Sequence, residues 1–168
     1  AQTKFAPPVL YCIINNHYGM TGRAEQEVSG VDYLARRGAG FAPNNMHAEV
    51  VNGMDPIAVR EAVRRARDIL IDGNGPVLLE FDTYRYYGHS LSDMRKEYRT
   101  RDEEGRWKEV DPVETYREVL KQIRGISEKK LNEVEERVRE RNARAARRAA
   151  DSPDPDASEV ITYMYTDS

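Results

Sequence analysis

Polar side chains that suit a metal and an anion follow two apolar runs of the sequence. The first run is Val9–Ile14, and Asn15 and Asn16 come directly after it. An asparagine side-chain oxygen is a hard, neutral ligand that suits Mg²⁺ or Ca²⁺, as does a main-chain carbonyl in a tight turn. Two neutral oxygens cannot balance a divalent charge, so at least one carboxylate and a phosphate must come from elsewhere. The alternative is that both asparagines only cap a strand end and shape a turn.

The second polar cluster comes at and just after the end of the apolar run 76–86. Arg85 carries a planar guanidinium that matches phosphate oxygens, and Gly88 lets the backbone turn sharply toward a ligand. His89 can donate to an oxyanion or move a proton near neutral pH. The histidine and the neighbouring tyrosines can equally serve packing. A site for phosphate and metal, and a purely structural role, are therefore both open for the two clusters.

The elements that must position these clusters alternate between strand and helix. Val9–Ile14 has the short continuous apolar pattern of a central parallel strand, and His47–Val51 and 76–86 predict two more strands. Between the last two strands, Asp55 and Pro56 predict the start of a helix. A strand, a helix and a strand of these lengths predict a crossover, and hence an α/β fold with a parallel sheet. Ligands bind such sheets outside the carboxyl ends of the strands, where both clusters stand.

The second half of the chain predicts helices after a long charged connection. Residues 88–110 show little periodicity, and a connection of that length is usually functional or disordered. We expect one helix from Asp111 and Pro112 and a longer one from Ser127, then a polar linker and a final strand or tail at 160–165. The residues expected on the buried helix faces are Val113, Tyr116, Leu120 and Ile123, then Leu131, Val134, Val138, Ala145 and Ala149.

Composition limits the classes of function. The 168 residues fit one ordinary domain or a large piece of one. The formal net charge of −3 gives no support to nucleic-acid binding, and no apolar run approaches the ~20 residues that span a bilayer. Cys12 is the one cysteine, which excludes an intrachain disulfide and fits a reducing compartment. Its place in an apolar run predicts a small, inert core residue.

Four stretches, in the order in which they follow one another along the chain, resemble one enzyme family. "IINNHYGM" (13–20) and "TYRYYGHSLSD" (83–93) resemble two signatures of the thiamine-diphosphate-dependent 2-oxo acid dehydrogenases. "VNGMDPIAVREAVRRA" (51–66) and "GPVLLEFDTYR" (75–85) are similar to segments between them. More narrowly, the chain resembles the alpha subunit of the pyruvate or acetoin dehydrogenase first component, or the alpha region of a fused alpha–beta chain.

The resemblance implies a partial thiamine-diphosphate-binding fold with C-terminal helices. Residues 1–110 would form the cofactor domain with its loop 85–101, residues 111–151 a helical region, and 152–168 a linker and tail. The implied reaction is oxidative decarboxylation of pyruvate or a similar 2-oxo acid, with acyl transfer to lipoamide. The implied cofactors are thiamine diphosphate and Mg²⁺. The residues leave open which 2-oxo acid, or acetoin, is the substrate.

The resemblance also implies roles for single residues. Asn16 would give its side-chain oxygen to Mg²⁺ and Tyr18 its main-chain oxygen. Arg85 would help hold the phosphates, and His89 would stand near the active centre as the catalytic candidate. Ser90 occupies a position that mitochondrial relatives phosphorylate, and a phosphate there would repel the cofactor diphosphate. The second phosphosite position is Glu97 here, which weakens a claim of control by a kinase. The alternative is that Ser90 only forms hydrogen bonds within the loop.

Departures from the family pattern shape the remaining expectations. The family's Asp-containing "GDG" segment is absent, so this chain resembles only the downstream half of the subunit. We therefore expect it to bind cofactor poorly and to be inactive alone. Expected partners are a beta subunit or beta region, which supplies the activating glutamate, and a lipoyl-bearing acyltransferase, in a hetero-oligomer or a homo-oligomer of a fused chain.

Two other functions and two compartments stay open. A non-catalytic interaction or scaffold module is the alternative to an enzyme component, with the charged helices docking a partner. A transketolase-like enzyme is a further alternative, against which "YRYYGHS" (84–90) argues. The expected compartment is a bacterial cytoplasm, with a mitochondrial matrix as the alternative.

Overall fold

The computed structural model describes residues 7–20, 22–24, 29–41, 46–93 and 98–162. The chain divides into two compact units, residues 1–119 and residues 120–168. The first unit contains a sheet, its covering helices and both polar clusters. The second unit contains a long helix and a short 3-10 helix.

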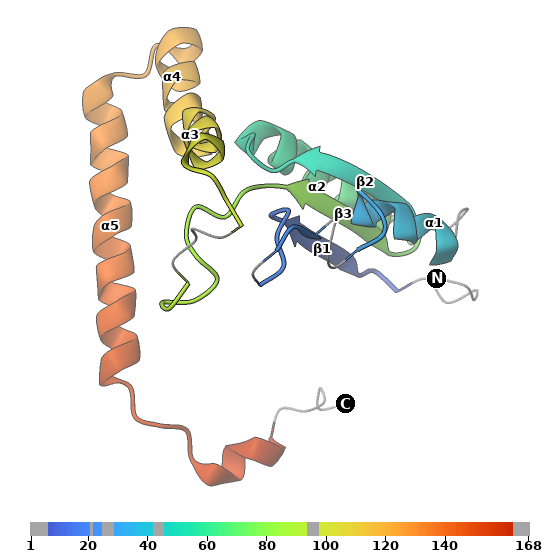
Figure 1. Ribbon diagram of the computed structural model, residues 1–168. Coiled ribbons are helices and arrows are strands. Elements are labelled where there is room, and N and C mark those ends of the chain that lie inside the picture. Colours follow the sequence, from blue (N-terminus) through green and yellow to red (C-terminus); the bar gives the residue numbers. More distant parts are fainter. Residues whose placement is uncertain (1–6, 21, 25–28, 42–45, 94–97, 163–168) are drawn as a thin grey trace. The chain divides into compact units, whose positions relative to one another are not determined.

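A parallel three-stranded sheet forms the centre of the first unit (Figure 1). Its strands are β1 (Leu10–Asn15), β2 (His47–Asn52) and β3 (Val77–Asp82), in the order β1-β3-β2. Asp82 pairs with Asn15 on one side and with Asn52 on the other, so all three strands end at the same edge. The predicted α/β class with a parallel sheet is confirmed.

The central strand of this sheet is β3, and the expectation that the first strand is central was wrong for the described sheet. Within the described residues β1 pairs with β3 alone. Tyr11 and Ile14 are 50% and 64% exposed, and Cys12 is exposed instead of buried. The apolar pattern of β1 is that of a strand covered on both sides. One neighbouring strand covers only part of it.

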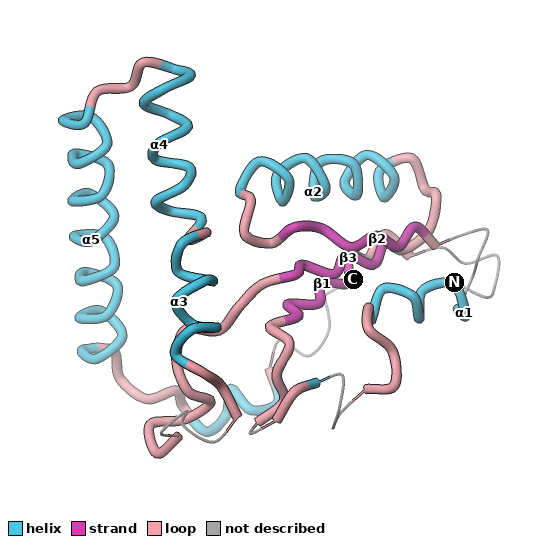
Figure 2. Tube along the Cα trace, turned by 45° about the horizontal axis from the view of Figure 1, so that its top comes forward, coloured by secondary structure: helices cyan, strands magenta, loops and turns pink. Residues whose placement is uncertain are grey.

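Helix α2 (Pro56–Ile71) covers one face of the sheet (Figure 2). Its predicted start is confirmed, because Asp55 Oδ1 accepts hydrogen bonds from the backbone N–H groups of Ile57 (2.8 Å) and Ala58 (3.2 Å). Ala62 and Ala66 are fully buried in a core with Val51, Val77, Leu79 and Phe81. These small side chains let the helix approach the strands closely.

The other face of β3 is contacted by the 3-10 helix η2 (Leu34–Arg37), which the short helix α1 (Gly38–Phe41) extends. Gly38 permits a close approach to β2, because a Cβ atom there would lie 2.6 Å from the Cβ of Ala48. Leu78 and Glu80 of β3 are buried. They alternate along the strand with the residues that form the core under α2.

Helix α3 (Arg101–Glu109) lies inside the segment expected to lack regular structure. Thr100 begins it, since its hydroxyl oxygen accepts a hydrogen bond from Glu103 N at 3.1 Å. Acidic residues in the first turn complement the helix dipole. The helix was missed because its sequence, RDEEGRWKE, has almost no apolar residues to reveal a period.

The helices α4 (Pro112–Arg124) and α5 (Glu128–Asp151) begin where the sequence predicts. Asp111 accepts a hydrogen bond from Val113 N at 2.9 Å, and Ser127 accepts one from Lys130 N at 3.3 Å. Their expected buried faces are wrong for this chain. No residue of either helix is buried, and Ile123 is 72% exposed.

The chain continues from α5 into the 3-10 helix η3 (Ala157–Ile161). Val160 and Ile161 belong to η3 and not to the strand or tail expected at 160–165; residues 163–165 lie outside the described residues. Among the described helices, none combines the length and apolar character needed to cross a bilayer.

Replacing Leu79 tests the core under α2. Leu79 is fully buried in the central strand, so Leu79→Ala should lower the free energy of unfolding by about 2–5 kcal/mol. The matched control is Leu91→Ala, because Leu91 is fully exposed and its loss should change that free energy by less than about 0.5 kcal/mol. Equilibrium urea unfolding measures both, and equal losses would contradict the described core.

Candidate functional site

The two polar clusters of the sequence come together at the carboxyl edge of the sheet. The main chain of Thr83 donates a hydrogen bond to the carbonyl of Asn15 at 2.9 Å, and the Thr83 hydroxyl donates to the same oxygen at 3.2 Å. Residues 15–19 and 83–85 therefore leave the sheet side by side. Their adjacency follows from the pairing of β1 with β3.

Two side chains tie the end of β1 to β3. Asn15 Nδ2 donates to Glu80 Oε1 at 2.6 Å, and His17 Nε2 lies 2.5 Å from Asp82 Oδ1. Asn15 Oδ1 accepts a hydrogen bond from His17 N at 3.0 Å. His17 has a φ of 65°, in the left-handed region that a β-carbon disfavours. These contacts hold the chain in a sharp turn directly after the strand.

Asn16 and Tyr18 occupy alternate positions of the same turn. Asn16 Oδ1 accepts a hydrogen bond from Tyr18 N at 3.0 Å. An amide oxygen has two lone pairs, so one stays available to a ligand. The Tyr18 side chain is buried, and its hydroxyl donates to Glu103 of α3. Burial and, after it, the hydrogen bond to the Glu103 carboxylate raise the pKa of the Tyr18 hydroxyl, which stays protonated.

Arg85 lies against this turn. Its Nη1 donates to the carbonyl of Gly19 at 3.4 Å, and its Nε donates to the carbonyl of Tyr87 at 3.2 Å. Its third nitrogen, Nη2, is buried and has no hydrogen-bond partner among the described residues. An unpaired buried guanidinium N–H is costly, so the arrangement suits an anion that accepts from it.

Arg99 organises the backbone that follows Arg85. Its side chain is fully buried and donates to the carbonyl of Arg85 and, at 2.9 Å, to the carbonyl of Tyr87. The guanidinium carbon also lies 5.3–5.6 Å from the ring centroids of Tyr18, Tyr84 and Tyr98. A cation among three aromatic faces is held electrostatically as well as by hydrogen bonds.

His89 and Ser90 are exposed in a tight turn that Asp93 closes. The Asp93 carboxylate accepts hydrogen bonds from His89 N at 2.7 Å and from the Tyr98 hydroxyl. Ser90 Oγ lies 3.0 Å from Ser92 Oγ. Gly88 lies at the start of this turn, where the backbone of Asp93 leaves little room for a side chain. Glu97, the residue at the second expected phosphosite position, lies outside the described residues.

Sequence reasoning missed several residues that shape the site. The missed residues are His17, Glu80, Asp82, Arg99, Glu103 and Trp107. The Trp107 indole stacks on the Tyr84 ring, with 5.1 Å between the ring centroids. A signal existed for Glu80 and Asp82, because two carboxylates stand at alternate positions of an apolar strand. No sequence signal identifies Glu103 as the partner of Tyr18, 85 residues away.

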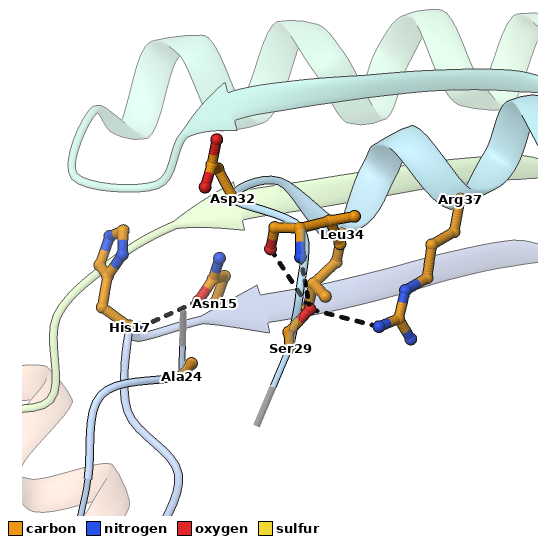
Figure 3. Close-up of a pocket in the computed structure, with 8 residues that line it drawn as sticks. Asn15, His17, Ala24, Ser29, Asp32, Leu34 and Arg37 are labelled. Carbon is orange, nitrogen blue, oxygen red and sulfur yellow. Dashed lines mark hydrogen bonds between the residues drawn. The ribbon is translucent and has the colours of Figure 1, made fainter. Parts of the chain in front are cut away.

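A small cavity of about 210 Å³ lies beside the strand end (Figure 3). Asn15, His17, Ser29, Asp32 and Arg37 contribute its polar lining. Asn16 and Tyr18 are not among its described lining residues. In the part of the chain that the structure describes, no three His, Cys, Asp or Glu side chains are grouped to hold a metal ion.

Gly88 offers a test of the His89 turn. A Cβ atom at Gly88 would lie 2.7 Å from the carbonyl oxygen of Asp93, so Gly88→Ala should open the turn and lower the melting temperature. The control is Gly105→Ala, since a Cβ there meets no atom within 4 Å and alanine in helix α3 should stabilise by about 0.5–1 kcal/mol. Thermal unfolding should give shifts of opposite sign; two shifts of the same sign would contradict the described turn.

Comparison with known proteins identifies the family of the chain. Residues 2–158 match the family described as the dehydrogenase E1 component. The chain is 40% identical, over 95% of its length, to pyruvate dehydrogenase E1 component subunit alpha-2, mitochondrial, of Arabidopsis thaliana. It is 36% identical to the alpha subunit of Dictyostelium discoideum and 35% identical to the testis-specific alpha subunit of Rattus norvegicus, each over 94% of its length.

These matches cover nearly all of this chain but only part of each relative. The chain covers 39% of the Arabidopsis and rat proteins and 41% of the Dictyostelium protein. It thus spans about two fifths of the length of the curated relatives that it matches. Since the family match covers nearly the whole chain, the predicted resemblance is confirmed, and this protein belongs to the dehydrogenase E1 component family.

Proposed function

We propose that this chain helps to hold Mg²⁺ and thiamine diphosphate in a 2-oxo acid dehydrogenase. The proposed reaction is oxidative decarboxylation of pyruvate or a similar 2-oxo acid, with acyl transfer to lipoamide. One observation carries the proposal. The buried, unpartnered Nη2 of Arg85 lies on a side chain that contacts the turn of Asn16 and Tyr18. The Arg85 nitrogen suits an anion, and the oxygens of the turn suit a cation, so the two features together fit a phosphate bound beside a metal ion.

The donor set of the turn fits Mg²⁺. Asn16 Oδ1 keeps a lone pair, and the main-chain oxygen of Tyr18 is a second hard, neutral donor. Mg²⁺ takes six oxygens and commonly draws some of them from phosphates and water. A carboxylate ligand must come from residues outside this set, since the two proposed protein ligands carry no charge. We therefore propose that the chain alone binds the cofactor poorly and is inactive.

His89 is the proposed catalytic residue. When bound, thiamine diphosphate supplies the carbanion chemistry of decarboxylation. The chain's own contribution is to hold His89 in a turn that Asp93 closes, with an exposed imidazole that can give or take a proton. Arg85 is proposed to hold phosphate oxygens with its free N–H group. The neighbouring Ser90 is exposed, and its phosphorylation, which would repel the diphosphate, stays a prediction.

Exposed apolar side chains support a larger assembly. Tyr11 and Ile14 of β1, Val113 and Ile123 of α4, and Val138 of α5 are all exposed. Apolar residues in such numbers outside a core are typical of surfaces that another chain covers. We propose a beta subunit or beta region and a lipoyl-bearing acyltransferase as the partners. A scaffold module without catalysis is the alternative, and the intact donor set of the turn favours the enzyme.

The names of the relatives bear on the expected cellular compartment. Those reported above are named as mitochondrial proteins, so the comparison gives no support to the expected bacterial cytoplasm. The alternative compartment, a mitochondrion, is the one compatible with their names.

Asn16→Ala tests the proposed metal turn. It should raise the Mg²⁺ concentration required for thiamine diphosphate binding by more than about tenfold, because replacing even an outer-shell partner typically costs 10–100-fold in affinity. Calorimetric titration of the complete protein with its partners measures this change.

Asn52→Ala is the matched control. Asn52 lies at the end of strand β2, and its Oδ1 accepts a hydrogen bond from Met54 N, two residues on, at 3.0 Å, as Asn16 Oδ1 does from Tyr18 N. Asn52→Ala should leave cofactor binding unchanged. Equal effects of the two substitutions would show that Asn16 only shapes its turn. Micromolar cofactor binding by the isolated chain would contradict the proposed dependence on outside ligands.

A further inference from the structure

We propose that Glu80 is a positioning residue for the magnesium-binding turn, an inference that rests on the proposed function. Glu80 lies on the central strand β3, and its side chain is fully buried. Its hydrogen-bond partners among the described residues are both uncharged. Burying a carboxylate whose described partners carry no positive charge is costly, so the residue requires a reason beyond packing.

Two donors from different elements converge on this carboxylate. Asn15 Nδ2 donates to Oε1 at 2.6 Å, and the backbone N–H of Ala35, in helix η2, donates to Oε2 at 2.7 Å. A carboxylate accepts both bonds at once. A glutamine has one oxygen and one NH₂ group, so it would satisfy one donor and confront the other with a second donor. The site therefore selects glutamate over its neutral isostere.

The bond to Glu80 determines which way the Asn15 amide points. With Nδ2 directed at Glu80, Asn15 Oδ1 faces the opposite way and accepts from His17 N at 3.0 Å. That bond holds His17 in its left-handed conformation, with a φ of 65°. The next residue, Tyr18, donates its own N–H to Asn16 Oδ1. Two hydrogen bonds thus link the buried carboxylate to His17 N. The backbone then leads from His17 to Tyr18, whose N–H joins the two proposed metal ligands through its bond to Asn16 Oδ1.

The same contacts could instead serve only to join β1, β3 and η2. A purely structural link predicts lower stability with unchanged ligand affinity in the folded protein. A positioning role predicts that a variant without the Glu80 carboxylate, while fully folded, needs more Mg²⁺ than the wild type to bind thiamine diphosphate. It also predicts faster hydrogen exchange of the turn amides, 17–18, before any cofactor is added.

The test compares Glu80→Gln with Glu49→Gln in the complete protein, purified with its partners. Glu49 is a matched control because it lies on the neighbouring strand β2. Its carboxylate is paired with Arg65 (2.6 Å) and His47 (2.9 Å), and in the described part of the chain neither partner belongs to the turn. Two readouts are taken: amide exchange over residues 15–20 without cofactor, and thiamine diphosphate affinity as a function of Mg²⁺ concentration.

We expect Glu80→Gln to accelerate exchange of the turn amides and to raise the required Mg²⁺ by about 10- to 100-fold, as for other groups that orient metal ligands. Glu49→Gln should change neither readout. If Glu80→Gln does not fold, Asn15→Ala takes its place, because it removes the link to the turn while leaving the bond between Glu80 and Ala35. Asn15→Ala should reproduce both effects.

Unchanged exchange and unchanged Mg²⁺ dependence in a folded variant would overturn the role of Glu80. A lower melting temperature with both readouts unchanged would also overturn it, in favour of a structural link. If the wild-type protein binds no thiamine diphosphate, the proposed function fails. The exchange measurement then still decides whether Glu80 orders the turn.

Discussion

The site depends on side chains of β3 that reach across to the end of β1. Glu80 binds Asn15 and Asp82 binds His17, one on the last residue of the strand and one in the turn beyond it. Parallel pairing makes this possible, because it brings both carboxyl ends to one edge of the sheet. These two bonds act together with the local hydrogen bond from His17 N to Asn15 Oδ1 to hold His17 in a left-handed conformation. The geometry of Asn16 and Tyr18 is therefore a property of two strands together.

A second layer of contacts joins this turn to the loop that carries His89. Glu103 of α3 accepts from the Tyr18 hydroxyl and, at 2.9 Å, from Arg23. Arg99, just before α3, holds the carbonyls of Arg85 and Tyr87. The two signature stretches are thus packed against one aromatic and cationic cluster. A change in either stretch is expected to be felt by the other, since they share these partners.

The exposed apolar side chains agree with a chain that matches only part of each relative. The chain spans about two fifths of the length of its relatives, and β1 has the composition of a strand with cover on both sides. Helices α4 and α5 have apolar stripes but no buried residue. Their sequences are consistent with packing that the described residues do not provide. Composition and periodicity predict burial, but they cannot say which chain supplies the covering surface.

The sequence by itself determined the parallel α/β class, the starts of α2, α4 and α5, and the two stretches that carry the candidate site. These features depend on local rules of capping and apolar periodicity, or on motifs that stay contiguous in the chain. Only the tertiary structure decided that β3 is central, that Cys12 is exposed, and that α3 exists within a charged segment. It alone paired Glu80 with Asn15, and Glu103 with Tyr18. Such pairs join residues 65 and 85 positions apart, and no local pattern encodes a contact that arises only when the sheet forms.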